Sequence, residues 1–184
     1  MLRKFKQWKI KVKNQIQVII NTLNMKKIII LALIFIINSE NMFSQNYFDY
    51  KKERNLFNLK LISKNQKILS YKKINDSERF QGRYLGEVKT NQGKYYIVIS
   101  SFIFNLKNSP SAENHIFIYT DKKQFFGYYY LSHINELPTI LKKCKLYFDN
   151  KDCKEKNIIN LDNGFPKAIN LKCNGENNYY ELNK

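Results

Sequence analysis

The chain has 184 residues, with 32 Lys+Arg against 15 Asp+Glu, so its formal net charge is +17 at pH 7. Only 3 cysteines and 2 histidines are present, and no Cys-x-x-Cys pair, which argues against a zinc site. Catalysis needs titratable or nucleophilic side chains in a suitable arrangement, and the sequence offers no such motif, so we expect no metal, no cofactor and a non-enzymatic role.

An export signal is predicted inside the chain. Two lysines after Met25 precede an unbroken apolar run at 28–37, and a polar stretch follows at 38–44. This layout is typical of a secretory signal peptide, and the apolar run is shorter than the roughly 20 residues that span a bilayer. We therefore predict a signal peptide at 25–44, a secreted or periplasmic protein, and no stable membrane span after processing.

Residues 1–24 form a basic leader before this signal. They contain no acid, and Phe5, Trp8 and Val12 recur at the spacing of one helix face. The pattern fits a basic amphipathic helix on an anionic membrane surface, or an organelle transit peptide. Two other interpretations stay open: a misassigned start, with translation beginning at Met25, and an unusually long positive end of the signal peptide.

Cleavage is favoured between Ser44 and Gln45, which leaves a single predicted β-domain at 45–184. The preceding residues hold 8 of the Lys+Arg and 1 of the Asp+Glu, so 24 remain against 14, a net charge of +10. The lysines come as scattered doublets, and phosphate recognition usually recruits more Arg than is present here. We expect dispersed charge, no specific nucleic-acid partner and a monomer.

Tyr, Phe and Ile are abundant after residue 45, which favours strands over helices. Two short turns, at 91–93 and 121–123, lie between apolar runs and predict β-hairpins. The strands expected around these turns are 83–90, 94–104, 115–120 and 124–131. Further strands are expected at 57–63, 67–74, 145–148, 157–161, 167–173 and 179–182.

Residues 46–54 have no clear period and are expected to form an irregular arm. The one expected helix is at 136–143, where Leu137, Ile140 and Leu141 have helical spacing. The predicted fold is therefore mainly β: an antiparallel β-sandwich or partly closed barrel of about nine strands, with one short helix.

The aromatic run from Phe125 to Tyr130 is the candidate binding site. Strand alternation would send Phe126, Tyr128 and Tyr130 to one face, where rings could stack on sugars or bases. Core packing of these rings is the alternative. Gly127 between them indicates a bulge or a close approach of backbone.

Other candidate residues give weaker evidence of a functional site. His115 and His133, the latter with Glu136 nearby, are expected to be ordinary strand-edge and loop residues, because sequence proximity alone makes no general base. Ser100 and Ser101 lie within a predicted strand and lack the Gly-flanked elbow of a hydrolase nucleophile.

Cys153 and Cys173 are expected to form a disulfide, because an oxidising compartment permits one and the Asn163-Gly164 turn would bring their strands together across a hairpin. Cys144 is then the free thiol. Pairing of Cys144 with Cys153, and three reduced cysteines, are the alternatives.

The leading functional hypothesis is an exported, non-enzymatic β-domain that binds a macromolecule or a cell-envelope component. The alternative is a β-barrel or sandwich that carries a small apolar or aromatic ligand. A hydrolase with an unrecognised site is the third possibility.

Overall fold

Two antiparallel sheets and one helix make up the regular structure of residues 50–184, the part of the chain that the computed structural model describes. The predicted leader at 1–24 and signal peptide at 25–44 lie outside the described residues. The strands are β1 (Ser70–Lys73), β2 (Arg79–Thr90), β3 (Gly93–Phe104), β4 (Ser111–Thr120), β5 (Phe125–Leu131), β6 (Ile140–Lys142), β7 (Lys145–Phe148), β8 (Asn157–Asn160), β9 (Ala168–Cys173) and β10 (Glu176–Asn183), with a 3-10 turn η1 (Ile134–Glu136) between β5 and β6.

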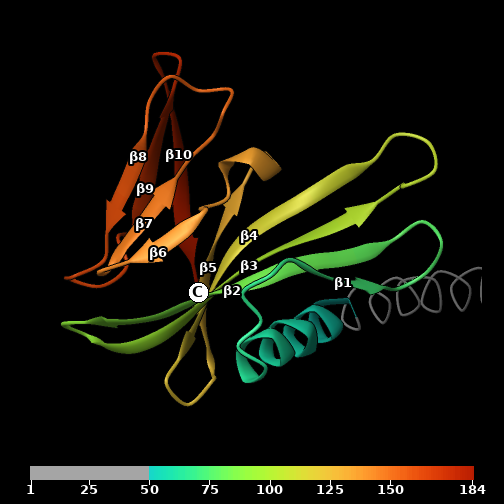
Figure 1. Cartoon of the computed structure of the whole chain (residues 1–184), viewed down its shortest axis with the longest axis horizontal. Helices are drawn as coiled ribbons and strands as arrows, with labels where there is room; N and C mark the ends of the chain where they lie inside the picture. Colours follow the sequence, from blue (N-terminus) through green and yellow to red (C-terminus); the bar gives the residue numbers. More distant parts are fainter. Residues whose placement is uncertain (1–49) are drawn as a thin grey trace, which may run out of the picture. The chain divides into compact units, whose positions relative to one another are not determined.

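The large sheet has seven strands in the order β1-β2-β3-β4-β5-β10-β9, and the small sheet has three in the order β6-β7-β8. The small sheet packs on one face of the large sheet, which is strongly twisted (Figure 1). This arrangement confirms the mainly β, sandwich-like fold. Residues 52–184 form one compact unit, while the predicted domain start at residue 45 stays a prediction.

Both predicted hairpins are confirmed. β2 and β3 pair across the turn that ends at Gly93, and β4 and β5 pair across the turn at 121–123. The apolar and aromatic residues that suggested these strands are the ones that build the core. On β3, Ile97 and Ile99 alternate toward the small sheet, which contributes Leu146 and Phe148 to the same cluster.

A helix at 50–63 covers the opposite face of the large sheet, so the predicted strand at 57–63 is wrong. The predicted irregular arm at 46–54 is also wrong for residues 50–54, which belong to this helix. Its buried side chains recur at steps of three and four, which places them on one helix face; they are Arg54, Phe57, Asn58, Leu61 and Ile62. Phe57 stacks on Phe80 of β2, with ring centroids 5.9 Å apart. Two of the five buried residues are polar, and this concealed the helical period in the sequence.

The helix ends in a left-handed turn. Asn65 has φ 49°, and the following amide, from Gln66, donates to the oxygen of Leu61 at 2.9 Å. Asn65 itself donates to Ile62 at 3.1 Å, so two of the last carbonyls of the helix are satisfied. Asn suits this position because it tolerates positive φ better than most residues.

The predicted helix at 136–143 is also wrong. Pro138 forces the preceding residue out of the helical region, and Leu137 accordingly has φ −69° and ψ 140°. The chain then extends into β6, which pairs with β7 across a turn where Lys143 and Cys144 both have positive φ. Helical spacing of three apolar residues could not outweigh one proline.

Candidate functional site

A bulge divides the aromatic residues of β5 between two faces. Ile118 of β4 lies opposite Gly127, but the next residue, Tyr119, lies opposite Phe125, so Phe126 is the extra residue. Its ring packs in the core, 5.0 Å from the Tyr95 ring centroid. The prediction that Phe126 shares a face with Tyr128 and Tyr130 is therefore wrong.

Tyr128 and Tyr130 lie on the helix-side face of the sheet, around His115 of β4. The His115 ring centroid is 4.9 Å from that of Tyr128 and 5.1 Å from that of Tyr130. Two further rings, Phe117 and Phe125, extend the cluster. We call these five residues the aromatic face. Phe125 and Tyr130 are 47% and 46% exposed, so these two rings reach solvent, whereas His115 at the centre is buried.

The same face continues over β10 and β9 with polar side chains. Asn183 lies opposite Tyr128, and alternate residues along β10 share its direction. Tyr179, which is 67% exposed, is one of them, and it lies opposite Asn170 of β9. Exposed aromatic rings and amides therefore occupy neighbouring strands of one open sheet surface.

Gly127 is fixed by the close approach of β10. A Cβ atom at this position would lie 2.6 Å from the backbone oxygen of Asn183, a distance that no side chain could accept. Both predicted roles of Gly127, a bulge partner and a close backbone approach, are met at this one residue.

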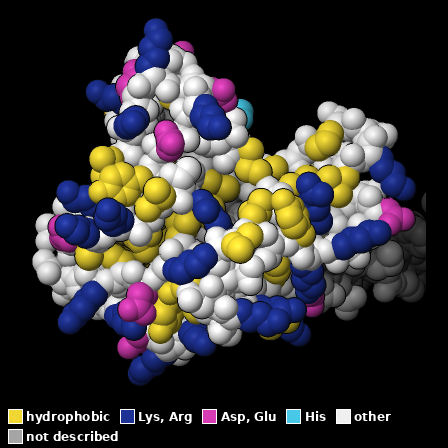
Figure 2. Space-filling model, in the orientation of Figure 1, with side chains coloured by type: hydrophobic (Ala, Val, Ile, Leu, Met, Phe, Trp, Pro, Cys, Tyr) yellow, Lys and Arg dark blue, Asp and Glu magenta, His cyan; other side chains and the backbone are white. Residues whose placement is uncertain are grey.

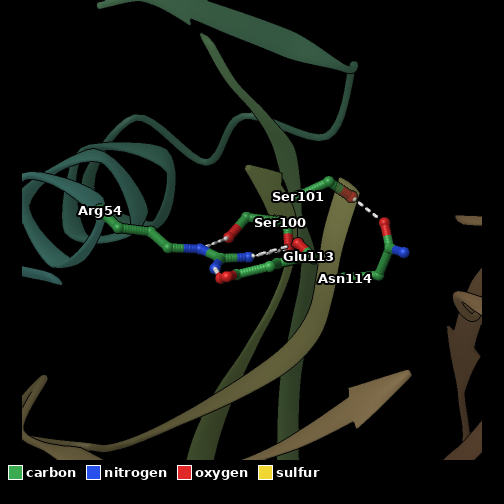
Figure 3. Close-up of polar contacts among 5 residues, drawn as sticks. All are labelled: Arg54, Ser100, Ser101, Glu113 and Asn114. Carbon is green, nitrogen blue, oxygen red and sulfur yellow. Dashed lines mark hydrogen bonds and ion pairs between the residues drawn. The ribbon is translucent and has the colours of Figure 1, made fainter. Parts of the chain in front are cut away.

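Ser100 and Ser101 take part in a structural network. The guanidinium of Arg54 donates to the Ser100 backbone oxygen at 2.6 Å and to the Ser100 hydroxyl at 3.3 Å, and it lies 3.6 Å from a Glu113 carboxylate oxygen (Figure 3). On the other face of β3, Ser101 donates to Asn114 Oδ1 at 2.7 Å. Neither hydroxyl has a catalytic histidine as its hydrogen-bond partner among the described residues.

The two histidines lie on different elements, His115 on β4 and His133 at the start of η1. His115 is buried and its Nδ1 has no partner among the described residues. Burial, and next the nearby Arg54 cation, lower the pKa of His115 to about 3. Glu136 accepts a hydrogen bond from the backbone N of His133 at 2.9 Å and so caps η1. The side chains of His133 and Glu136 therefore do not form the general-base pair that their sequence proximity suggested.

Within residues 50–184 no group of three or more His, Cys, Asp and Glu side chains is gathered as a metal site would require. The helices in this part of the chain include none with the length and apolar character of a membrane span.

Cys153 and Cys173 form a disulfide, with Cα atoms 4.7 Å apart, and Cys144 is free. The reason given for this pairing is wrong, however, because β8 and β9 belong to different sheets and make no hairpin. The bond instead ties the loop after β7 to the end of β9, and so joins the small sheet to the large one.

A pocket of about 530 Å³, which no sequence pattern predicted, lies on the core side of the large sheet, beyond the end of the packed core. Gln81, Arg83 and Ser101 line it from β2 and β3, and segments after η1 and after β7 form its rim. Gln81 is only 8% exposed, and its amide has no hydrogen-bond partner in the described part of the chain. Register alone brings these residues together, so spacing along the sequence could not reveal them.

Comparisons with known proteins give no assignment: no protein-family model, no curated protein and no solved structure matches this chain.

Proposed function

We propose that the protein is an exported, non-enzymatic module that binds a cell-envelope glycan on its aromatic face. The observation that carries this proposal is the gathering of five rings on the helix side of the large sheet, around the buried His115. Phe125 and Tyr130 at its rim are nearly half exposed. An exposed cluster of this kind is typical of an interaction surface.

The chemistry of the surface favours sugar rings. One face of a pyranose ring is lined with C–H groups and stacks on an aromatic side chain, while its hydroxyls need hydrogen-bonding partners at the edge. Tyr supplies both an apolar ring and a polar tip. Asn183 and Tyr179 on the adjoining strand add an amide and a further hydroxyl on the same face.

The charge of the protein does not favour a nucleic acid. Lys and Arg side chains are spread over the face drawn in Figure 2 and are not collected into one groove. A nucleic-acid site would need a basic stripe along the aromatic rings. Stacking on a neutral glycan needs no such stripe.

Export is supported by the disulfide, since disulfides form and persist in oxidising compartments. The test is N-terminal sequencing of the protein from its native host. We expect it to begin near Gln45, and an intact Met1 or Met25 would contradict export.

The glycan proposal is tested with the processed protein, neutral chito- and cello-oligosaccharides, and isolated envelope polysaccharide. We expect binding that persists at high salt, because stacking is not screened as charge pairs are. Replacing Tyr128 and Tyr130 by Ser should weaken it at least about tenfold. Tyr71→Ser is the matched control, since Tyr71 is an exposed tyrosine on the distant strand β1.

Three outcomes would overturn the proposal: no binding to any of these glycans, binding lost in salt, or equal loss in the Tyr71 control.

The alternative function, a carrier of a small apolar or aromatic ligand, has less support. The space between the sheets is filled by buried side chains, and the pocket beside it is lined partly by exposed charged residues, which an apolar ligand would not favour.

A further inference from the structure

The two edges of the large sheet differ. At the β9 edge, the Asn157 side chain donates to the Lys172 backbone oxygen at 2.9 Å and accepts from its backbone N at 2.8 Å. One side-chain amide thus occupies both backbone groups, and the disulfide at Cys173 covers the end of the strand. Such blocking prevents another strand from pairing there.

The β1 edge has no such cover. Hydrogen-bonded and non-hydrogen-bonded pairs alternate in an antiparallel ladder, and Ile74 donates to the Glu78 oxygen across the β1–β2 turn. Lys72 and Ser70 are then bonded to β2, while Tyr71 and Lys73 direct their backbone groups outward. In the described part of the chain no strand pairs with this side of β1.

Apolar side chains surround this edge. The exposed fraction is 76% for Ile68, 42% for Leu69, 58% for Tyr71 and 44% for Ile74, and Leu56 of the helix is 49% exposed nearby. An open edge with exposed apolar side chains is a template for a further strand. Lys72 and Lys73 on the strand are paired with Glu53 and Asp76, but the net positive charge of the protein opposes pairing between two copies of it.

Pockets lie on both faces of the sheet beside this edge. On the helix side, a pocket of about 380 Å³ is lined by Leu56, Leu61 and Ser70, among others. On the opposite face lies the pocket of about 530 Å³ with Leu69 at its rim and the unpartnered amide of Gln81. Side chains of a strand alternate between faces, so a strand added to β1 would direct them in turn toward these two pockets.

Charge identifies the occupant. The helix-side pocket is lined by Lys60, Lys64 and Lys72 and by no acid. Lys72 is paired with Glu53 of the helix, so Lys60 and Lys64 give the pocket its positive charge. The opposite pocket is lined by two cations and two anions, including Arg83 and Asp149, and so has no net charge. We propose that β1 binds an extended peptide segment of a partner protein by strand addition, with acidic and apolar residues toward the helix and neutral polar residues toward Gln81.

This site lies on a different part of the sheet from the aromatic face and does not depend on glycan binding. The test uses the processed protein and a short capped peptide. Every second residue of the peptide is Glu or Leu, for the face toward the helix, and the residues between them are Ser. A second peptide has Lys in place of Glu. We expect the Glu peptide to bind at least about tenfold more tightly, and to slow hydrogen exchange at the amides of Tyr71 and Lys73.

A matched pair of variants tests the backbone contact. Lys73→Pro removes one outward N–H, which an edge strand tolerates, whereas Lys73→Ala keeps it, and both remove the same exposed side chain. Peptide affinity should fall about five- to tenfold in the proline variant relative to the alanine variant. Glycan binding should be equal in both.

Equal affinity for the two peptides, equal affinity of the two variants, or no peptide binding by the wild type would overturn the proposal. So would dimers that Lys73→Pro abolishes, because the edge would then pair with a second copy. If the proline variant unfolds, hydrogen exchange at Tyr71 and Lys73 in the wild type decides the matter alone.

Discussion

Nη2 of Arg54 lies 2.6 Å from the backbone oxygen of Ser100, so one helix residue binds the centre of the large sheet across 46 positions of sequence. The same nitrogen donates to the Glu113 backbone oxygen at 3.0 Å, and the guanidinium lies 5.0 Å from the centroid of the Phe117 ring. One buried cation, which is only 4% exposed, therefore attaches the helix to both β3 and β4.

Arg54→Ala should lower the free energy of unfolding by about 3 kcal/mol, because it leaves buried acceptors without their donor. Urea unfolding followed by circular dichroism measures this. Lys52→Ala, at an exposed position of the same helix, should change stability by less than about 0.5 kcal/mol. Similar effects of the two substitutions would contradict the role assigned to Arg54.

Acid should destabilise the protein through His115. Its pKa is lowered to about 3 when folded, against a reference of 6.5. The unfolded chain therefore binds a proton first as the pH falls. The contribution of neutral His115 to the free energy of unfolding is fully present above pH 6.5. This free energy should decrease by on the order of 3 kcal/mol by about pH 4.

His115→Phe should flatten this acid slope, because Phe packs among rings and does not titrate. Chemical denaturation at several pH values gives the slopes of both proteins. An imidazole of His115 that titrates near its reference value in nuclear magnetic resonance spectra would contradict the prediction.

Alkali should destabilise the protein through buried phenols. Burial raises the pKa of Tyr84, Tyr119 and Tyr180 to about 12, from a reference of 10.0. The unfolded chain then loses these protons first. The contribution of these protonated phenols to the free energy of unfolding is fully present below pH 10, and it should be lost as the pH rises from 10 to 12. Ultraviolet titration should reveal tyrosines that ionise late, and a single uniform transition near pH 10 would refute this.

Loss of the disulfide should cost about 3 kcal/mol, because the bond closes a loop with a sequence separation of 20. Thermal unfolding of a variant with both Cys153 and Cys173 replaced by Ser measures this loss. Cys144→Ser is the control, since Cys144 is not bonded to another cysteine. Its effect should be under about 1 kcal/mol.

Local signals were sufficient where chain neighbours pair. The turn at 91–93 ends in Gly93, which has φ 137°, and both strands around it were predicted. The helix at 50–63 escaped because Arg54 and Asn58 are polar, yet buried by partners that lie far away in the sequence. Asn58, for example, donates to the Tyr119 hydroxyl at 3.1 Å.

The candidate site could be predicted only in part, for a similar reason. The aromatic residues of β5 were apparent, but the bulge that separates Phe126 from Tyr128 depends on how β4 aligns with β5. The pocket beside Gln81 is formed where five separate segments of the chain come together. The hydrophobic period and the composition each describe one segment at a time. They contain no information about which distant segments contact one another in the fold.

The position of β10 has a consequence for how the protein reaches its folded state. This strand, the last in chain order, lies between β5 and β9 and pairs with both. Until β10 is in place, β5 has no neighbour on that side and β9 cannot join the large sheet. Pairing between such distant segments is slow, so the large sheet is completed late in folding.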